Sequence, residues 1–466
     1  MLKISGIKIS RATLLLLATD SLSVALGLTV ARAASLLMYG DASPQQFYSA
    51  QTLLRLGLVV FIWDVALYYN ELYDLRISKR RSVMFNQLLQ ALGVACLALA
   101  VLYYAAPRLS LGRDVTALAV PVILILLLGC RLVLDHLGLL RHYLDRVLIV
   151  GTGEAGICLV REILSRPDFN LKVVGFLDES GENVGKSLVN PGIIGAISEV
   201  QDIAVRQRIN RVVLSLAERR GCMPLPQLLR LKFAGIRVEE AHSFYEELTG
   251  RILLERLSPS WLILSDGFRK SPLLMALKRA SDVVISLSAL LIALPVMGLV
   301  ALAIWMESGR PVLFRQRRVG LWSRQFDILK FRSMVHDAEA NGPCWAVEDD
   351  SRVTRVGRFI RRYRLDELPQ FFNVLRGEMS LVGPRPERPH FCELLEKEIP
   401  LFSERHSVRP GITGWAQIKY QYGSSAKEAK EKLQLDLFYI KHLSVLLDAA
   451  IILETFKVVV LGRGAK

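Results

Sequence analysis

The residue types that could do chemistry gather between positions 361 and 386, which read RRYRLDELPQFFNVLRGEMSLVGPRP. Two adjacent acids, Asp366 and Glu367, follow arginines at positions 358, 361, 362 and 364, and Arg385 stands farther along between two prolines. Carboxylates among arginines can hold a metal ion and a phosphate group together, so this spacing is typical of phosphate chemistry. The alternative is an ordinary helix cap with surface ion pairs around it.

Pro369 predicts the element that positions the two acids. Proline is tolerated in the first turn of a helix, so a helix is expected from near Leu368 to Leu375. Asp366 and Glu367 would then lie at or just before its N-terminus. The unpaired N–H groups of a helix N-terminus attract phosphate.

The composition requires a membrane. Hydrophobic residues make up 52% of the 466 residues and the mean hydropathy is +0.33. Four apolar stretches have about the 20 residues that a spanning helix needs, and they occupy Ala12–Ala31, Thr52–Tyr69, Phe85–Ala105 and Ala117–Leu134. A four-helix transmembrane bundle is therefore expected over residues 1–140. A chain of this length should contain two or three domains.

Charge and cysteines indicate the compartment and the partners. The basic residues Arg76, Lys79, Arg80, Arg81, Arg141 and Arg146 follow the second and fourth stretches. The positive-inside rule then places both ends of the bundle in the cytoplasm. The net charge of +15 favours anionic lipid or phosphorylated substrates, and no nucleic-acid partner is expected. The six cysteines are scattered, which fits a reducing compartment and argues against structural zinc.

A nucleotide-binding pattern follows the bundle. Residues 146–156 read RVLIVGTGEAG, a strand followed by Gly151, Gly153 and Gly156 in the GxGxxG spacing. A second strand ends at Asp178, where acids that bind ribose often lie. Alternating strands and helices predict a Rossmann-like parallel α/β domain over residues 145–250. A bound dinucleotide, a regulatory nucleotide site and a purely structural module all remain open.

A second kind of membrane element occupies Val283–Met306, an apolar helix with Pro295 at its middle. Basic residues flank it on both sides, at Lys278 and Arg279 and again from Arg310 to Arg318. A proline-broken helix that enters and returns on one face places both flanks in the cytoplasm, and a full span is the alternative.

The following residues carry a family resemblance. The pieces FRQRRVG (314–320), KFRSM (330–334), LDELPQFFNVLRGEMSLVGPRP (365–386), RPGITGWAQ (409–417) and LDLFYI (435–440) are similar to motifs of the bacterial sugar transferases. These enzymes, also called monotopic phosphoglycosyl transferases, initiate glycan assembly on polyprenyl phosphate. The resemblance covers nearly 190 residues and implies a monotopic α+β catalytic domain over 270–466. More loosely, the whole architecture looks like that of the large family members.

The resemblance implies residue roles. Asp366 matches the family's nucleophile and Glu367 its metal-binding acid, which implies a Mg²⁺ cofactor, with Mn²⁺ as a substitute. The positions that match phosphate- or substrate-binding residues are Arg385, Lys330, Arg361 and Asp436. Two departures stand out. Leu294-Pro295 replaces a common Ser-Pro, and Ile418-Lys419-Tyr420 replaces a common asparagine-glycine pair, which leaves the sugar open.

The reaction that the resemblance implies is transfer of a hexose-1-phosphate from a UDP-sugar to undecaprenyl phosphate, with release of UMP through a phosphoaspartate. The protein would be a homodimer in the bacterial inner membrane with its catalytic domain on the cytoplasmic face, serving exopolysaccharide, capsule or O-antigen synthesis. Two alternatives remain. A membrane-bound nucleotide-sugar dehydratase would need a Tyr-x-x-x-Lys pair, which the sequence lacks, and a non-catalytic export scaffold would not need the acid pair.

Overall fold

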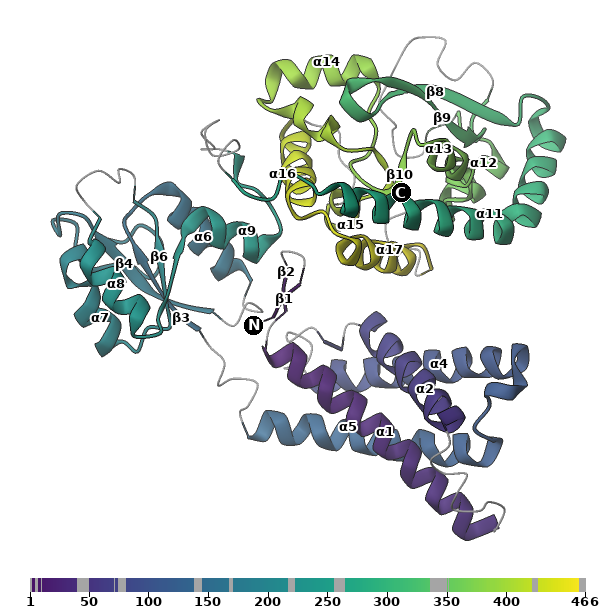
Figure 1. The fold of residues 1–466 in the computed structure, drawn as a ribbon, viewed down its shortest axis with the longest axis horizontal. Helices are drawn as coiled ribbons and strands as arrows, with labels where there is room; N and C mark the ends of the chain where they lie inside the picture. Colours follow the sequence, from purple (N-terminus) through teal and green to yellow (C-terminus); the bar gives the residue numbers. More distant parts are fainter. Residues whose placement is uncertain are drawn as a thin grey trace. The chain divides into compact units, whose positions relative to one another are not determined.

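The structure is a computed structural model that describes residues 2–4, 7–9, 11–39, 50–70, 72–73, 81–137, 145–166, 171–216, 223–254, 265–335, 350, 352–420 and 426–460 (Figure 1). Contacts divide the chain into two compact units, one with Met1–Lys3 and Lys8–Phe244 and the other with Ile4–Ile7 and Tyr245–Lys466. The division into three domains at 1–140, 145–250 and 270–466 stays a prediction. A short pair of strands, β1 (Leu2–Ile4) and β2 (Ile7–Ile9), begins the described chain.

Four long apolar helices form the first part of unit 1. They are α1 (Arg11–Tyr39), α2 (Ala50–Tyr69), α4 (Arg81–Ala105) and α5 (Arg113–His136). Their buried side chains share one core, in which Val24, Trp63, Leu88 and Ile123 meet. These helices and α11 (Pro272–Ser308) are each long and apolar enough to cross a membrane. The chain is therefore a membrane protein, as predicted.

An ion pair is buried inside this helical core. The carboxylate of Asp20 contacts the guanidinium of Arg131, and both side chains are fully buried. Arg131 Nη1 also donates to the carbonyl oxygen of Leu72 at 2.9 Å. Charges in apolar surroundings persist only when they are paired, so this pair joins α1 to α5. Arg76, Lys79, Arg80 and Arg141, on which the topology prediction depends, lie outside the described residues.

The second part of unit 1 contains the parallel sheet that the sequence predicted. Its strand order is β5-β4-β3-β6-β7, and every pair is parallel. The strands are β3 (Asp145–Val150), β4 (Leu171–Asp178), β5 (Ile193–Ala196), β6 (Arg211–Leu214) and β7 (Arg237–Glu240). The helices are α6 (Glu154–Ser165), α7 (Val200–Arg206) and α8 (Leu225–Phe233), and α9 (Ala241–Thr249), which follows β7, contains the boundary between the two units. Strand β5 was not among the strands predicted from the sequence, whereas β6 and β7, which are equally short, were.

Unit 2 combines helices with two small sheets. An antiparallel pair joins β8 (Leu313–Val319) to β9 (Gln325–Phe331), and a parallel pair joins β10 (Ser380–Val382) to β11 (Gly411–Thr413). The other helices are α12 (Arg355–Arg362), α13 (Gln370–Arg376), α14 (Pro389–Glu398), α15 (Trp415–Lys419), α16 (Ala426–His442) and α17 (Val445–Val460). Strands β9 and β10, one from each sheet, both contact α13.

Helix α11 is continuous from Pro272 to Ser308 and contains Pro295. The helix continues past Pro295 without interruption, and Figure 1 shows that it changes direction sharply within its length. Lys278 and Arg279, which the sequence placed on a basic membrane flank, contact other parts of unit 2. Lys278 Nζ donates to Asp448 at 2.6 Å, and Arg279 donates to the carbonyl oxygens of Val374 and Leu375 at 2.6 and 2.9 Å. Arg279 therefore caps the C-terminus of α13.

Candidate active site

The two acids lie where the sequence placed them, immediately before α13. Asp366 and Glu367 belong to a single 3-10 turn, Leu365–Glu367, and Pro369 occupies the N-cap of α13. Arg364 precedes the turn in the left-handed conformation, with φ of 53°. L residues adopt this conformation rarely, and it changes the direction of the backbone immediately before the turn that carries the two acids.

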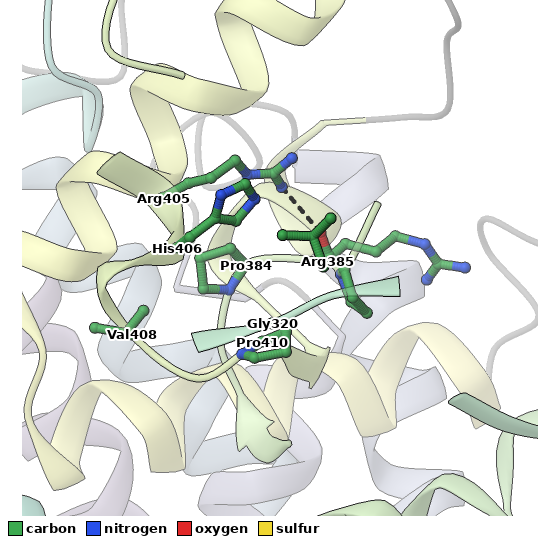
Figure 2. A pocket seen from close by; sticks show the side chains of 9 residues that line it. Gly320, Pro384, Arg385, Arg405, His406, Val408 and Pro410 are labelled. Atoms are coloured by element: carbon green, nitrogen blue, oxygen red, sulfur yellow. Dashed lines mark hydrogen bonds between the residues drawn. The ribbon is translucent and has the colours of Figure 1, made fainter. Parts of the chain in front are cut away.

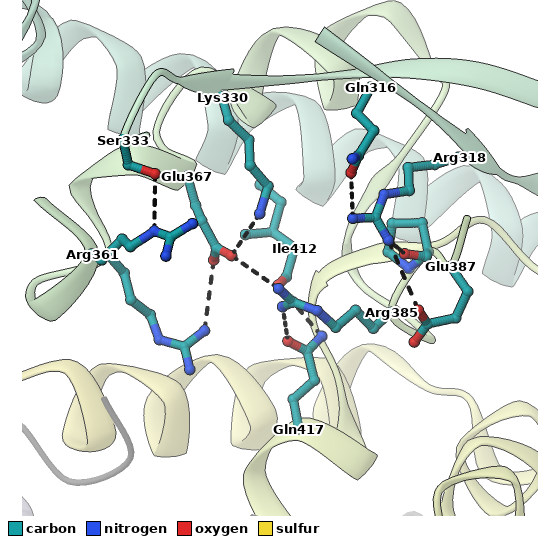
Figure 3. Close-up of polar contacts among 12 residues, drawn as sticks. Gln316, Arg318, Lys330, Ser333, Arg361, Glu367, Arg385, Glu387, Ile412 and Gln417 are labelled. Carbon is teal, nitrogen blue, oxygen red and sulfur yellow. Dashed lines mark hydrogen bonds and ion pairs between the residues drawn. The ribbon is translucent and has the colours of Figure 1, made fainter. Parts of the chain in front are cut away.

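Glu367 lies among three basic side chains (Figure 3). Its Oε1 is 3.4 Å from Lys330 Nζ and 3.3 Å from Arg385 Nη2, and its Oε2 is 3.6 Å from Arg364 Nη1. Burial by itself would raise the pKa of Glu367. The charges of Lys330, Arg385 and Arg364 outweigh burial and hold that pKa below its usual value. Glu367 is thus a carboxylate at neutral pH.

Asp366 has a different environment. Its side chain is only 8% exposed, and burial together with the charge of Glu367 raises its pKa. Lys330, Arg361 and Arg385 partly offset that increase. Two neighbouring carboxyl groups with pKa values pushed in opposite directions are typical of a pair in which each acid has its own task.

The strand that carries Lys330 is fixed to α13 by Asn373, which is fully buried. Asn373 Oδ1 accepts from the N–H of Leu329 at 3.0 Å, and Asn373 Nδ2 donates to the carbonyl oxygen of Asp327 at 2.8 Å. These bonds fix the backbone of the strand from which the Lys330 side chain extends to Glu367. Arg332, which directly follows β9, donates to the carbonyl oxygens of Ser308 and Gly309 at the end of α11.

The turn that carries Arg385 is held along its backbone. Four consecutive carbonyl oxygens, from Pro384 to Glu387, accept hydrogen bonds at 2.9 to 3.0 Å. Backbone N–H groups donate to the first and last of them: Gly411 to Pro384 and Val319 to Glu387. Guanidinium groups donate to the two between: Arg405 Nη2 to Arg385 and Arg318 Nη1 to Pro386. Figure 2 shows Arg405 beside this turn, where a small pocket lies between it and Gly320, His406 and Pro410. The guanidinium of Arg385 itself reaches Gln417 Oε1 at 2.9 Å and Glu367.

Asp436 and Arg361 each form a hydrogen bond or ion pair with a residue outside the predicted set. Asp436 is 1% exposed, and its carboxylate pairs with Arg405 Nη2 at 2.8 Å. It reaches the Arg385 turn only through Arg405, so the described geometry supports a positioning contact, and the predicted phosphate-binding role stays a prediction. Arg361 Nε donates to Ser333 Oγ at 2.9 Å, and Figure 3 shows this contact near Glu367.

Among the residues that contact the predicted set but were absent from it are Arg364, Arg405 and Gln417. Arg364 stands in the basic run, but only its positive φ shows that it turns back to Glu367. Gln417 ends the RPGITGWAQ motif and contacts a residue 32 positions earlier. Arg405 has no local sequence signal, since its partners Arg385 and Asp436 are distant in the chain.

The glycines of the predicted nucleotide site lie at the start of α6, as expected, but the neighbouring strand occupies the space beside them. Cβ atoms placed on Gly151 and Gly153 would lie 2.6 and 2.5 Å from the carbonyl oxygen of Ser215, at the end of β6. Gly156 N–H donates to Ser215 Oγ at 2.8 Å. Close packing on Ser215 therefore accounts for all three glycines, and nucleotide binding stays a prediction.

Asp178, the proposed ribose-binding acid, lies at the end of β4. Its Oδ2 accepts from the N–H of Gly181 and from Asn183 Nδ2 at 3.1 and 3.2 Å. The carboxylate thus stabilises the loop that follows its own strand.

The acid pair fits a Mg²⁺ ion that phosphate oxygens would complete. The three cations contact Glu367 at 3.3 Å or more, longer than the 2.7–2.9 Å of a strong charged hydrogen bond, so its oxygens are not committed to one tight partner. Within the described ranges no group of three or more His, Cys, Asp or Glu gathers. Mg²⁺ is commonly held by one or two carboxylates plus substrate phosphates.

Two sequence profiles and several known proteins match this chain. The sequence profile described as bacterial sugar transferase matches residues 273–462, and that of a CoA-binding domain matches residues 69–223. The UDP-N-acetylgalactosamine-undecaprenyl-phosphate N-acetylgalactosaminephosphotransferase of Aeromonas hydrophila is 42% identical over 239 residues, which are 51% of this chain and 56% of that protein. The undecaprenyl-phosphate glucose phosphotransferase of Komagataeibacter xylinus is 36% identical over 332 residues, 70% of this chain and 61% of that protein.

A shorter relative is matched over most of its length. The exopolysaccharide production protein PSS of Rhizobium leguminosarum bv. phaseoli is 41% identical over 187 residues, which are 39% of this chain and 94% of that protein. This chain spans less than two thirds of the two longer relatives but nearly all of the shorter one. The matched range 273–462 contains the acid pair, Lys330 and the Arg385 turn. The chain belongs to the bacterial sugar transferase family.

Proposed function

We propose that this protein transfers a hexose-1-phosphate from a UDP-sugar to undecaprenyl phosphate and releases UMP. The single observation that carries the proposal is the pair of acids in unlike environments, a buried Asp366 beside a Glu367 that faces Lys330, Arg364 and Arg385. Two relatives, an undecaprenyl-phosphate N-acetylgalactosaminephosphotransferase and an undecaprenyl-phosphate glucose phosphotransferase, support undecaprenyl phosphate as the acceptor.

Asp366 would act as the nucleophile. One of its carboxylate oxygens attacks the sugar-bearing phosphorus of the donor, and the bond from that phosphorus to the bridging oxygen of UMP breaks. The resulting acyl phosphate stays reactive, which suits an intermediate. An oxygen of undecaprenyl phosphate then attacks the same phosphorus, and the bond to Asp366 breaks. Each step exchanges one P–O bond for another, so no co-reactant is needed.

The basic groups would neutralise charge in the transferred phosphate. Phosphoryl transfer depends mainly on positioning and electrostatic stabilisation. Arg385 suits this role because its planar guanidinium can bind two oxygens, and because its backbone is held at four consecutive carbonyls. Glu367 would hold Mg²⁺, or Mn²⁺ in its place, and the ion would balance the charge of the donor diphosphate.

We also propose a membrane arrangement. Helices α1, α2, α4 and α5 would form a four-helix transmembrane bundle in the bacterial inner membrane, with unit 2 on the cytoplasmic face and α11 as a re-entrant helix. Unit 2 contacts both ends of α11, through Lys278 and Arg279 near its start and through Arg332 and Ser308 at its end. A full span would put those ends on opposite faces, so these contacts favour re-entry. A homodimer is proposed from family resemblance.

The test is UMP release from a panel of UDP-sugars in membranes that contain undecaprenyl phosphate and Mg²⁺. The panel includes UDP-N-acetylgalactosamine, UDP-glucose and UDP-galactose. UMP that forms with one donor and disappears in Asp366→Asn would establish the reaction class. Release of UDP would instead mean ordinary glycosyl transfer and a wrong mechanism. No release from any donor would favour a scaffold.

The metal role of Glu367 has its own test. In Glu367→Gln the Mg²⁺ concentration for half-maximal UMP release should rise at least about tenfold, because a neutral amide binds a hard cation poorly. Glu393→Gln, at an exposed position of α14, is the matched control and should leave that concentration unchanged. An unaltered metal requirement in Glu367→Gln would remove the assignment.

A further inference from the structure

The segment 245–252 belongs to the core of unit 2, although it lies outside both matched ranges, which cover 69–223 and 273–462. Ile252 is 1% exposed and packs in the same core as Trp415 and Phe438. Its N–H donates to the carbonyl oxygen of Gln434 in α16 at 3.1 Å. The segment is thus built into the fold that carries the active site.

Glu246 ties this segment to the end of α16. Its side chain is 6% exposed and accepts from Lys441 Nζ at 2.8 Å and from His442 Nε2 at 2.7 Å. Burial would raise the pKa of Glu246, but the hydrogen bonds and charges of His442 and Lys441 lower it. The imidazole of His442 lies 4.6 Å from the ring of Phe438, which stacks on Trp415 at 5.8 Å.

Gly250 makes the direct contact with Trp415. Its carbonyl oxygen accepts from Trp415 Nε1 at 2.8 Å. Gly250 has φ of +67°, and a Cβ atom there would lie 2.9 Å from Trp415 Cζ2. A side chain at position 250 would therefore be strained and would also displace the indole ring.

Trp415 in turn positions a residue of the site. It is the first residue of α15, a helix of five residues, and Gln417 follows two positions later. Gln417 Oε1 accepts from Arg385 Nη1 at 2.9 Å (Figure 3). So short a helix has little stability of its own. The packing of Trp415 on Gly250 and Phe438 therefore sets the orientation in which Gln417 meets Arg385.

We propose that residues 245–252 are a positioning segment of the active site, which holds the Arg385 guanidinium in place through Trp415 and Gln417. The inference rests on the proposed function, because Arg385 matters only if it binds the donor phosphates. It predicts that the catalytic domain needs chain from before its family-matched range.

The test compares Gly250→Ala with Gly235→Ala. Both glycines have a positive φ, +67° and +87°, but a Cβ atom on Gly235 would meet nothing within 4 Å. Gly250→Ala should raise the KM for the UDP-sugar about tenfold, whereas Gly235→Ala should leave it unchanged. Partial unfolding would lower the active fraction and hence kcat, but not raise KM. The KM of the double variant Gly250→Ala/Gln417→Ala should equal that of Gln417→Ala alone, since both substitutions act through the same contact.

Two further measurements keep the inference open to refutation. Hydrogen exchange over residues 411–419 should be faster in Gly250→Ala than in Gly235→Ala, whatever reaction the enzyme catalyses. Glu246→Gln, a milder change, should raise KM in the same direction. Equal exchange and equal KM in the two glycine variants would overturn the positioning role. If exchange differs but the wild-type protein releases no UMP, the positioning contact stands and the proposed function fails.

Discussion

Arg385 Nη2 lies 3.3 Å from Glu367 Oε1, while Nη1 of the same guanidinium donates to Gln417 at 2.9 Å. Arg385 thus joins the acid pair to α15 across residues that are distant in the chain. A guanidinium can make both contacts at once because its N–H groups are fixed in a plane, whereas a lysine ammonium cannot reproduce that geometry.

We therefore expect Arg385→Lys to lower kcat/KM for UMP release about a hundredfold, equivalent to about 3 kcal/mol of transition-state stabilisation. Steady-state assays over a range of donor concentrations would measure this. The matched control is Arg376→Lys, at an exposed position in the last turn of α13. A lysine at position 385 that supports wild-type kcat/KM would rule out planar recognition at this site.

Asp366→Asn should abolish UMP release and also stabilise the folded protein at neutral pH. Burial and the charge of Glu367 raise the folded-state pKa of Asp366 above 3.8, to about 6. The folded protein thus holds this proton more tightly than the unfolded chain, and its stability falls as pH rises through that window. Asparagine removes this cost. The expected gain is about 1 to 2 kcal/mol at pH 8 and less near pH 4.

Thermal unfolding of both proteins in detergent at the two pH values measures the difference. A gain that is as large near pH 4 as at pH 8 would show that the ionisation of Asp366 is not its source.

The pH dependence of activity follows from the same group. Asp366 must be ionised to attack, so kcat/KM should fall as pH drops toward about 6, well above the ordinary aspartate pKa of 3.8. Glu367 stays ionised throughout, because Lys330, Arg385 and Arg364 hold its pKa below the usual value. A pH–rate profile of kcat/KM for UMP release at subsaturating Mg²⁺, which reports groups of the free enzyme, would show the acidic limb. A limb that begins only near pH 4 would place the nucleophile elsewhere.

The turn between β8 and β9 predicts a stabilising substitution away from the chemistry. Trp322 and Ser323 have φ of 54° and 58°, a left-handed pair that hairpins usually assign to Asn-Gly. Trp322 is 69% exposed, so its ring contributes little packing. Trp322→Asn should raise the free energy of unfolding by about 1 kcal/mol, because asparagine tolerates this conformation.

Trp322→Ala separates the two contributions to that change. It removes the ring but keeps the strain, and it should not be more stable than the wild-type protein. Chemical denaturation of the three proteins would measure the differences. Equal stability of Trp322→Asn and Trp322→Ala would show that strain at this turn has no measurable cost.

Local sequence was informative where one short stretch determines its own geometry. Pro369 placed the acid pair before α13, and the GxGxxG spacing placed a parallel sheet around β3. The contacts of residues whose partners are distant in the chain could not be predicted from local sequence. Lys278 counted as a membrane flank, yet it is buried against Asp448, 170 positions away. Arg405 and Gln417 likewise depend on contacts that no periodicity reveals.

The contacts near the start of α11 also determine which changes in chain length this helix can accept. Lys278, Arg279 and Asp282 face three different partners, Asp448, the end of α13 and Ser380. Each helical residue adds about 100° of rotation and 1.5 Å of rise. Inserting one residue between Arg279 and Asp282 would turn one set of side chains away while the other stayed in place. Helix α11 should therefore tolerate exchanges of one apolar residue for another. A single insertion or deletion between Arg279 and Asp282 would instead break contacts that hold the helix to the elements around the acid pair.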